Sequence, residues 1–280
     1  MAHVRWTARP ALREPAVIAA FEGWNDAGDA ATTAARYLVD RWDLDLIGEV
    51  DPEEFYDFTS TRPQVQLDDD GRREIVWPTT EIFGGTIAGG DLDVVVVVGT
   101  EPQLRWRTYC SELAEIATTQ GASLCLTLGA LLAEVPHTRP TSIVGTAYEP
   151  DVIAGLELQP SSYEGPTGIV GVLHHAWREA GLRSASLWAT VPSYVPGAPS
   201  PKAALALIER TATMLQTWVP TTDLEIASAA YERQVSELVD ADEETSSYVA
   251  SLEQGHDDAP GVVPSAESIA EEVERFLREQ

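Results

Sequence analysis

Four short stretches of the sequence carry the residue types that could bind a ligand or do chemistry. The first, 22–29, lies between a predicted strand and a predicted helix, and its candidate residues are Glu22, Trp24, Asn25, Asp26 and Asp29. Its two glycines allow a tight turn and a close approach to a ligand, and the N–H groups that begin the next helix could receive an anion. The carboxylates of the loop would repel a phosphate unless a cation intervened. An equally open interpretation is a turn capped by Asp29, with Trp24 packed over it.

The second and third stretches add a carboxylate and an imidazole. Glu101 follows a run of five valines, so it lies either at the working end of a strand or in a solvated turn. Glu134, His137 and Arg139 fall within six residues of one another. His137 beside Glu134 could act as a base or contact a ligand. The two prolines of this stretch fit an ordinary rigid connection equally well.

The fourth stretch has two parts, 163–168 and 192–202, and each part leads into a predicted helix. Its candidate residues are Glu164, Ser193, Tyr194 and Lys202. The glycines of the first part do not have the spacing of a dinucleotide fingerprint, and no glycine-rich phosphate loop precedes Lys202. The prolines around Tyr194 indicate a rigid, shaped loop, which suits a binding surface as well as an active site.

The sequence offers no signature of a metal site, a cofactor or a familiar hydrolase. It has no Cys/His spacing typical of metal ligands and no Gly-x-Ser-x-Gly elbow. We therefore expect no metal and no cofactor, and we assign no catalytic residue. Cys110 and Cys125 both lie in apolar segments, which indicates buried thiols in a reducing compartment.

Strand and helix patterns alternate along the chain and predict how these stretches are held. Short apolar runs predict strands at 16–21, 93–99, 123–128, 142–147 and 185–191. Helical spacing predicts helices at 30–42, 106–120, 168–180 and 201–218, with Asp29 as the N-cap of the first. This alternation predicts an α/β fold with a mainly parallel sheet and helices on both faces. Ligands of such sheets bind at loops beyond the carboxyl ends of the strands, where the four stretches lie.

Two parts of the chain depart from this alternation. The stretch 44–87 mixes turn signals with short aromatic segments, and we interpret it as a hairpin-bearing insertion in a core domain of residues 1–220. Residues 221–280 form an acidic helical extension, because 223–280 holds 16 acidic and three basic side chains. Helices are predicted at 224–239 and 265–277, with a linker at 255–264. They would form either a helical hairpin packed on the core or a mobile arm.

The formal net charge of −27 at pH 7 limits the partners. Phosphate backbones and anionic membranes repel such a surface, so we expect neither nucleic acid nor a membrane as partner. Only one of the basic residues is a lysine, Lys202, which disfavours a nucleotide-using enzyme that holds phosphate with lysine. The first 13 residues have no apolar run, and the longest apolar stretch is too short to cross a bilayer. We therefore expect a cytoplasmic protein.

Four motifs together resemble the proteasome assembly chaperone type-two family, especially its actinobacterial branch. They are 21–31 (FEGWNDAGDAA), 132–140 (LAEVPHTRP), 163–168 (YEGPTG) and 192–203 (PSYVPGAPSPKA). The resemblance spans nearly the whole chain, and its motifs coincide with the candidate stretches. It implies a three-layer αβα sandwich like that of nucleoside phosphorylases and peptidyl-tRNA hydrolases. It also implies self-association, with a trimer favoured, and no established catalytic residues.

In eukaryotic and archaeal members, the resemblance implies a role in assembling proteasome α-rings. Some of those chaperones dock on the ring by a tail of hydrophobic residue, Tyr and any residue. This sequence ends Leu-Arg-Glu-Gln and lacks that tail, so we do not expect docking by this route.

Three functions remain open from the sequence. The favoured hypothesis is a protein-interaction or assembly-chaperone-like protein, with protein partners that include proteasome components. The alternative is a phosphorylase- or hydrolase-like enzyme that uses Glu22, Asp26, Glu101 and His137 on a small molecule, if these side chains converge in one pocket. An ATP-dependent carboxylate–amine ligase is the least favoured, because there is no phosphate loop.

Overall fold

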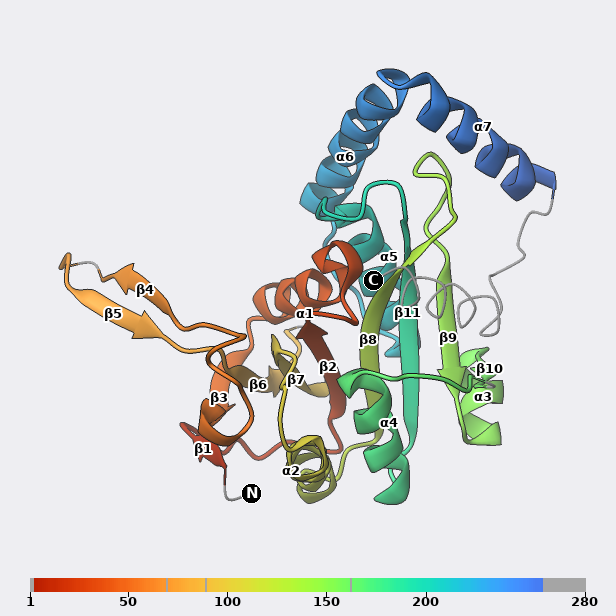
Figure 1. Cartoon of the computed structure of the whole chain (residues 1–280). Helices are drawn as coiled ribbons and strands as arrows, with labels where there is room; N and C mark the ends of the chain where they lie inside the picture. Colours follow the sequence, from red (N-terminus) through yellow and green to blue (C-terminus); the bar gives the residue numbers. More distant parts are fainter. Residues whose placement is uncertain (1–2, 69, 89, 162, 259–280) are drawn as a thin grey trace.

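One mixed sheet of nine strands runs through the protein, in the order β1-β3-β6-β7-β2-β8-β11-β9-β10 (Figure 1). The computed structural model describes residues 3–258 except 69, 89 and 162. Two further strands, β4 and β5, pair only with each other. The strands are β1 (Val4–Trp6), β2 (Ala16–Glu22), β3 (Asp45–Val50), β4 (Gln64–Leu67), β5 (Arg73–Val76), β6 (Thr80–Thr86), β7 (Asp93–Thr100), β8 (Leu124–Ala133), β9 (Ile143–Ala147), β10 (Gln159–Pro160) and β11 (Ser184–Pro192).

The centre of the sheet is parallel and its flanks are antiparallel. Strands β7, β2, β8 and β11 are neighbours and run in the same direction. On one side β6 pairs antiparallel with β7, and β3 and β1 continue antiparallel, whereas on the other side β9 pairs antiparallel with β11. The expected α/β fold is confirmed, but the sheet is mixed, because β3 and β6 belong to it. Both lie inside 44–87, which the sequence presented as an insertion.

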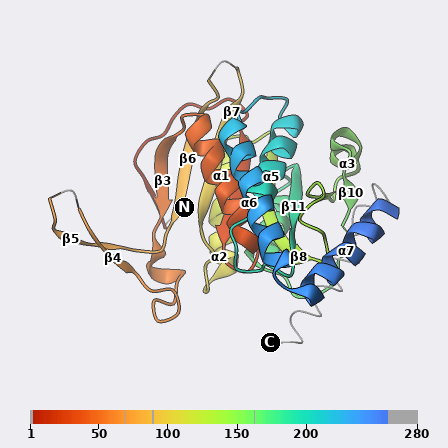
Figure 2. The ribbon, with the colours of Figure 1, turned by 90° about the horizontal axis from the view of Figure 1, so that it is seen from above.

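Helices cover both faces of the sheet, which gives the three layers that were expected. Helices α1 and α5 pack on one face, and α2 and α4 pack on the other; Figure 1 shows α1 and α2 on opposite sides of β2 and β7. In Figure 2, α1, α5 and α6 lie on the side of the sheet that faces the viewer. The helices are α1 (Ala30–Arg41), α2 (Trp106–Thr119), α3 (Pro150–Leu156), α4 (Ile169–Glu179), α5 (Pro201–Met214), α6 (Thr222–Asp240) and α7 (Glu243–Asp258), with short 3₁₀ turns at Ala27–Asp29 and Pro52–Glu54.

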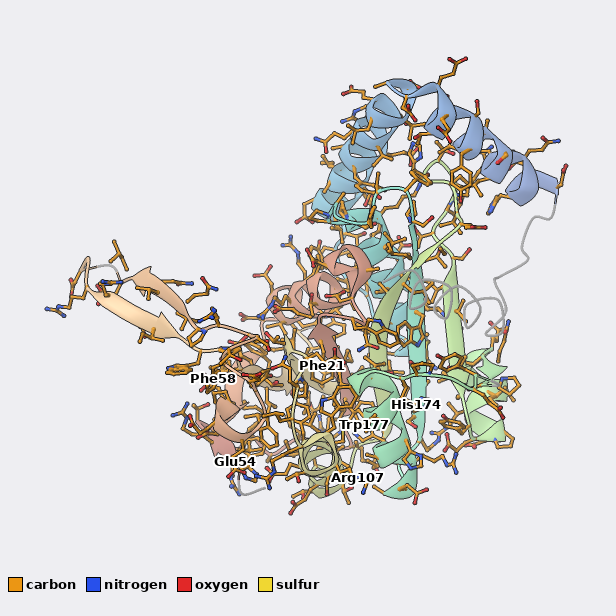
Figure 3. The ribbon with its side chains drawn as sticks, in the orientation of Figure 1. Phe21, Glu54, Phe58, Arg107, His174 and Trp177 are labelled. Carbon is orange, nitrogen blue, oxygen red and sulfur yellow. The ribbon has the colours of Figure 1, made fainter. Side chains whose placement is uncertain are left out.

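The valine run of β7 shows why the central strands need cover on both sides. Successive side chains of a strand point to opposite faces. Val94, Val96 and Val98 lie in the core beneath α1 and α5, whereas Val95 and Val97 lie in the core beneath α2 and α4. The second core also contains Phe21 and Trp177, whose side chains are almost fully buried (Figure 3). An unbroken β-branched run is therefore what a doubly covered strand requires.

The stretch 44–87 carries a hairpin, as expected, and this hairpin extends away from the sheet (Figure 1). We call β4, β5 and the turn between them the arm. At its base Phe58, labelled in Figure 3, lies edge-on to Trp77, with ring centroids 4.8 Å apart.

The acidic C-terminal segment forms two helices in the described residues, α6 and α7, joined at an angle (Figure 1). The predicted helix at 224–239 is confirmed within α6. The prediction of a linker from residue 255 is wrong for 255–258, because α7 runs to Asp258. The sequence of α7 is polar and has only weak helical periodicity, so the pattern of apolar residues did not predict this helix. The predicted helix at 265–277 lies outside the described residues, and the domain boundary at 220 stays a prediction. No helix within the described ranges has the length and apolar character needed to cross a membrane.

We predict that Leu38→Ala in α1 lowers the free energy of unfolding by about 2–5 kcal/mol, because it opens a cavity in a fully buried position. Leu238 on α6 is 65% exposed, so Leu238→Ala is the matched control and should change stability by less than about 0.5 kcal/mol. Equilibrium unfolding in urea measures both. Equal losses in the two variants would contradict the assignment of the core.

Candidate functional site

The loops at the carboxyl ends of the central strands enclose a cavity of about 790 Å³. Loop 23–29 after β2, residues 130–132 of β8 and residues 196–198 contribute to its wall, as do Ser161, Tyr163 and 165–167. The remaining wall comes from β9, β11, α4 and Tyr148. This volume is that of a typical small-molecule site, and such sites favour this edge of an α/β sheet.

A buried asparagine joins three of the elements that shape the cavity. The side-chain Nδ2 of Asn25 donates to Glu101 Oε1 at 2.9 Å, and its backbone oxygen accepts from Ala130 N at 2.8 Å. The same Glu101 oxygen accepts from Ile169 N at 2.8 Å, at the start of α4. A Cβ at Gly168 would lie 2.4 Å from Asn25 Nδ2, so this close approach requires glycine. Glu101 is therefore a structural acceptor between two loops.

Asp29 occupies the N-cap position of helix α1, as expected, but the side chain that caps the helix is that of Asp26. Asp26 Oδ1 accepts from Ala31 N at 2.6 Å, and Oδ2 accepts from the Thr32 hydroxyl and from Thr32 N at 3.3 Å. Asp29 makes no side-chain cap bond, and its φ of 50° is in the left-handed region. The spacing rule failed because a 3₁₀ turn at Ala27–Asp29 displaces the capping carboxylate by three residues. Burial raises the pKa of Asp26 to about 6, although these hydrogen bonds oppose the shift.

The helix N-termini at this edge are already occupied by the protein's own acceptors. Asp26 serves α1 and Glu101 serves α4, while Ser200 Oγ accepts from Ala203 N at 3.3 Å at the start of α5. Among the described residues that line the cavity, none is Lys or Arg. Because anion sites need free N–H groups or cations, the cavity is unsuited to a phosphate.

His137 and Tyr194 form a second group outside the wall of the large cavity, and His137 lines a much smaller cavity. His137 N donates to the Tyr194 oxygen at 2.7 Å, and the Tyr194 hydroxyl also lies 2.8 Å from Nδ1. The other ring nitrogen, Nε2, lies 2.9 Å from Ser236 Oγ of α6. Burial lowers the pKa of His137 and raises the pKa of Tyr194 to about 12. Both rings are neutral structural partners, and both nitrogens of the imidazole are engaged.

Charged groups beside His137 fasten the C-terminal helices to the core. Lys202 Nζ donates to His137 O at 2.5 Å and pairs with Glu232 of α6 at 2.8 Å. Arg139 makes two hydrogen bonds to Asp257 of α7, at 2.8 and 2.7 Å. We call these contacts, with His137–Ser236, the clamp. His137 and Arg139 therefore bind side chains of α6 and α7, and this structural role explains why the stretch 134–140 contains polar residues.

The remaining candidates lie outside the cavity wall. Glu22 accepts from Thr100 Oγ1 at 3.0 Å and lies 3.7 Å from Arg36, whereas Glu134 and Glu164 are exposed. Ser193 is half-buried, and its N–H donates to Ala133 O. The structure thus brings Trp24, Asn25, Asp26 and Asp29 together but separates them from His137, Tyr194 and Lys202.

The sequence did not reveal the aromatic part of the wall. Tyr148, Trp188 of β11 and His174 of α4 line the cavity, and none of them was a candidate; His174 is labelled in Figure 3. Trp188 lies opposite Gly129 in the β8–β11 register, where a Cβ would come within 2.7 Å of the Trp ring. Gly129 and Trp188 were the signal in the sequence that could have indicated this part of the wall. The two residues are far apart in the sequence, and only the pairing of β8 with β11 shows that they are neighbours.

The fold and the site define a class of protein: a three-layer α/β sandwich with a cavity at the strand ends. In the loops around this cavity, the carboxylates of Asp26 and Glu101 accept from backbone N–H groups at helix N-termini. The PAC2 family model matches residues 20–239, so the chain belongs to the PAC2 family. This confirms the resemblance in the sequence. None of the curated proteins matches the chain.

Solved structures agree with this assignment. A PAC2 family protein from Streptomyces avermitilis is 44% identical, with a TM-score of 0.79, and the match covers 84% of this chain and 99% of that one. A proteasome-assembly chaperone homologue from Mycobacterium tuberculosis is 43% identical, with a TM-score of 0.76 and the same coverage. PbaB from Pyrococcus furiosus, an archaeal proteasome activator, shares the fold at 16% identity and a TM-score of 0.67, over 84% of this chain and 97% of that one.

We predict a pH signature of the Asp26 cap. An unfolded Asp ionises near pH 4, whereas folded Asp26 keeps its proton until about pH 6, so its ionisation removes stability as pH rises through that window. Relative to wild type, Asp26→Asn should therefore gain about 1–3 kcal/mol between about pH 4 and 6 and stay level above it. Urea unfolding across this range measures the difference.

Asp93→Asn is the matched control for that experiment. Although burial opposes it, hydrogen bonds from Thr86 and Arg13 N hold the pKa of Asp93 below its ordinary value. Its contribution is lost only as pH falls below about 4, so this variant should run parallel to wild type above about pH 5. An Asp26→Asn curve that is also parallel would contradict the raised pKa.

We predict that Arg139→Gln loosens α7 without unfolding the core. Loss of the paired bonds to Asp257 should raise hydrogen exchange in α7 about two- to fivefold, because partly exposed ion pairs contribute up to about 1 kcal/mol. Arg183→Gln removes a surface pair with Asp151 and should leave α7 unchanged. Exchange measured by mass spectrometry would contradict the clamp if the two variants were alike.

Proposed function

We propose that this protein is a protein-interaction factor of the assembly-chaperone kind, with protein partners that include proteasome subunits. We further propose that it acts in the cytoplasm as a homo-oligomer, with a trimer favoured. The observation that carries the proposal is the arm, which extends away from the sheet (Figure 1) and exposes apolar side chains.

The arm has a surface that favours a protein partner. Val65 and Ile75 are paired across the hairpin, and Leu67 lies two residues on, so all three share one face. Leu67 is 70% exposed, and Val65 and Ile75 are each 54% exposed. A two-stranded hairpin is marginally stable alone, and neighbouring exposed apolar side chains mark contact sites. Cover from another chain would stabilise both the hairpin and the face.

Membership of the PAC2 family supports the nature of the partner. The M. tuberculosis relative is named a proteasome-assembly chaperone homologue, and the P. furiosus structure is an archaeal proteasome activator. The net charge of −27 favours a basic surface on the partner and disfavours nucleic acid.

The enzymatic alternative receives less support from the geometry. A phosphorylase needs a phosphate site, but at two of the helix N-termini beside the cavity the carboxylates of Asp26 and Glu101 already accept from backbone N–H groups. The proposed base His137 lines a separate, smaller cavity and binds Tyr194 and Ser236. Glu22, Asp26, Glu101 and His137 therefore do not converge on one substrate position.

We predict that the triple variant Val65→Thr, Leu67→Thr, Ile75→Thr loses assembly while remaining folded. Threonine keeps the strand preference and removes the apolar face. Sedimentation should show a shift from oligomer to monomer, and binding of purified proteasome α subunits in a surface-binding assay should fall at least tenfold.

The double variant Gln64→Thr, Gln66→Thr is the matched control, since both side chains lie on the other face of the same hairpin. It should keep wild-type assembly and binding. The proposal is wrong if wild type is monomeric and binds no α subunit, or if the two variants behave alike.

A further inference from the structure

We propose that the strand-end cavity binds a small organic cation: an amine or guanidinium attached to an aromatic or apolar body. The proposal is independent of the arm, which lies at the β3–β6 side of the molecule, whereas the cavity is bounded by β8, β9 and β11 (Figure 1). It rests on two properties of the wall: its aromatic surface and its charge.

Aromatic rings supply much of the wall. Trp24, Tyr148, Tyr163 and Trp188 come from four separate segments and converge on the same space. Trp24 is 40% exposed, which is unusual for a residue that a folded chain could bury. Aromatic faces attract both apolar bodies and cations. Tyr148 already does so on one side, where the guanidinium of Arg178 lies 4.8 Å from the ring centroid.

The charge of the wall is negative. Asp26 and Asp29 line the cavity, and no Lys or Arg does among the described residues. Asp29 is exposed, and its carboxylate makes no capping bond to the helix that it precedes. In a partly enclosed space of low polarity such charges act more strongly than on an open surface. A bound anion would be repelled, and a bound cation would be stabilised.

The test uses three probes of the same shape. Phenethylamine, phenylethanol and phenylacetate place a cation, a neutral hydroxyl and an anion on one aromatic body. Titration of the full chain, followed by amide NMR shifts and tryptophan fluorescence, should show phenethylamine binding with a dissociation constant on the order of 1 mM, as expected for so few atoms. Binding of phenylethanol should be at least about threefold weaker, and phenylacetate at least about tenfold weaker.

Two variants assign the binding to the cavity. Asp29→Asn removes a charge while keeping a residue that tolerates the left-handed backbone, and it should weaken phenethylamine binding about three- to tenfold. Asp43→Asn is the matched control, because Asp43 is also exposed with a φ of 53° but lies outside the cavity wall. It should bind phenethylamine as wild type does.

The proposal is overturned if phenethylamine does not bind, if the three probes bind equally, or if Asp29→Asn and Asp43→Asn bind alike. The threonine variant of the arm should keep phenethylamine binding. If this variant loses assembly but still binds phenethylamine, both proposals are supported. If it keeps assembly, the proposal for the arm is contradicted. If it loses phenethylamine binding, the proposed independence of the cavity from the arm is contradicted.

Discussion

The hydrogen-bonded link from β8 through Asn25 and Glu101 to the start of α4 is the constraint on which the strand-end architecture depends. It exists because β2 lies between β7 and β8 in parallel register, which brings the ends of all three strands to one edge. Asn25 reaches Ala130 on one side and Glu101 on the other. Gly168 is the matching condition, since any side chain there would displace Asn25 and move α4 away from the sheet.

The link also decides the electrostatics of the cavity. A carboxylate is required where Glu101 accepts from both Asn25 and Ile169, and another is required where Asp26 caps α1. These two carboxylates consume the N–H groups that many α/β proteins offer to phosphate. The carboxylates of these loops are therefore bound to N–H groups of the protein itself, so the individual hydrogen bonds, and not the fold alone, define the chemistry of this edge.

The sequence predicted the parts of the fold that local patterns control. The valine run of β7 requires two covered faces, and the motifs at 21–31 and 163–168 do belong to one edge. It did not predict β3 and β6 as strands of the main sheet, because Gly84 and Gly85 weaken the pattern of β6. Nor did it separate His137 from Trp24. Both follow strands at the same edge, and only the course of α6 shows that His137 faces the C-terminal helices.

The loop 192–200 contacts both the C-terminal helices and the cavity. Tyr194 and Val195 pack with Tyr231, Val235 and Val249 of the C-terminal helices, whereas 196–198 forms part of the cavity wall. The N–H of Ser200 at the end of this loop donates to Gly28 O at 2.7 Å, which joins it to the loop after β2. The loop therefore packs against α6 and α7 on one side and lines the cavity on the other, and its prolines restrict the backbone that joins these two contacts.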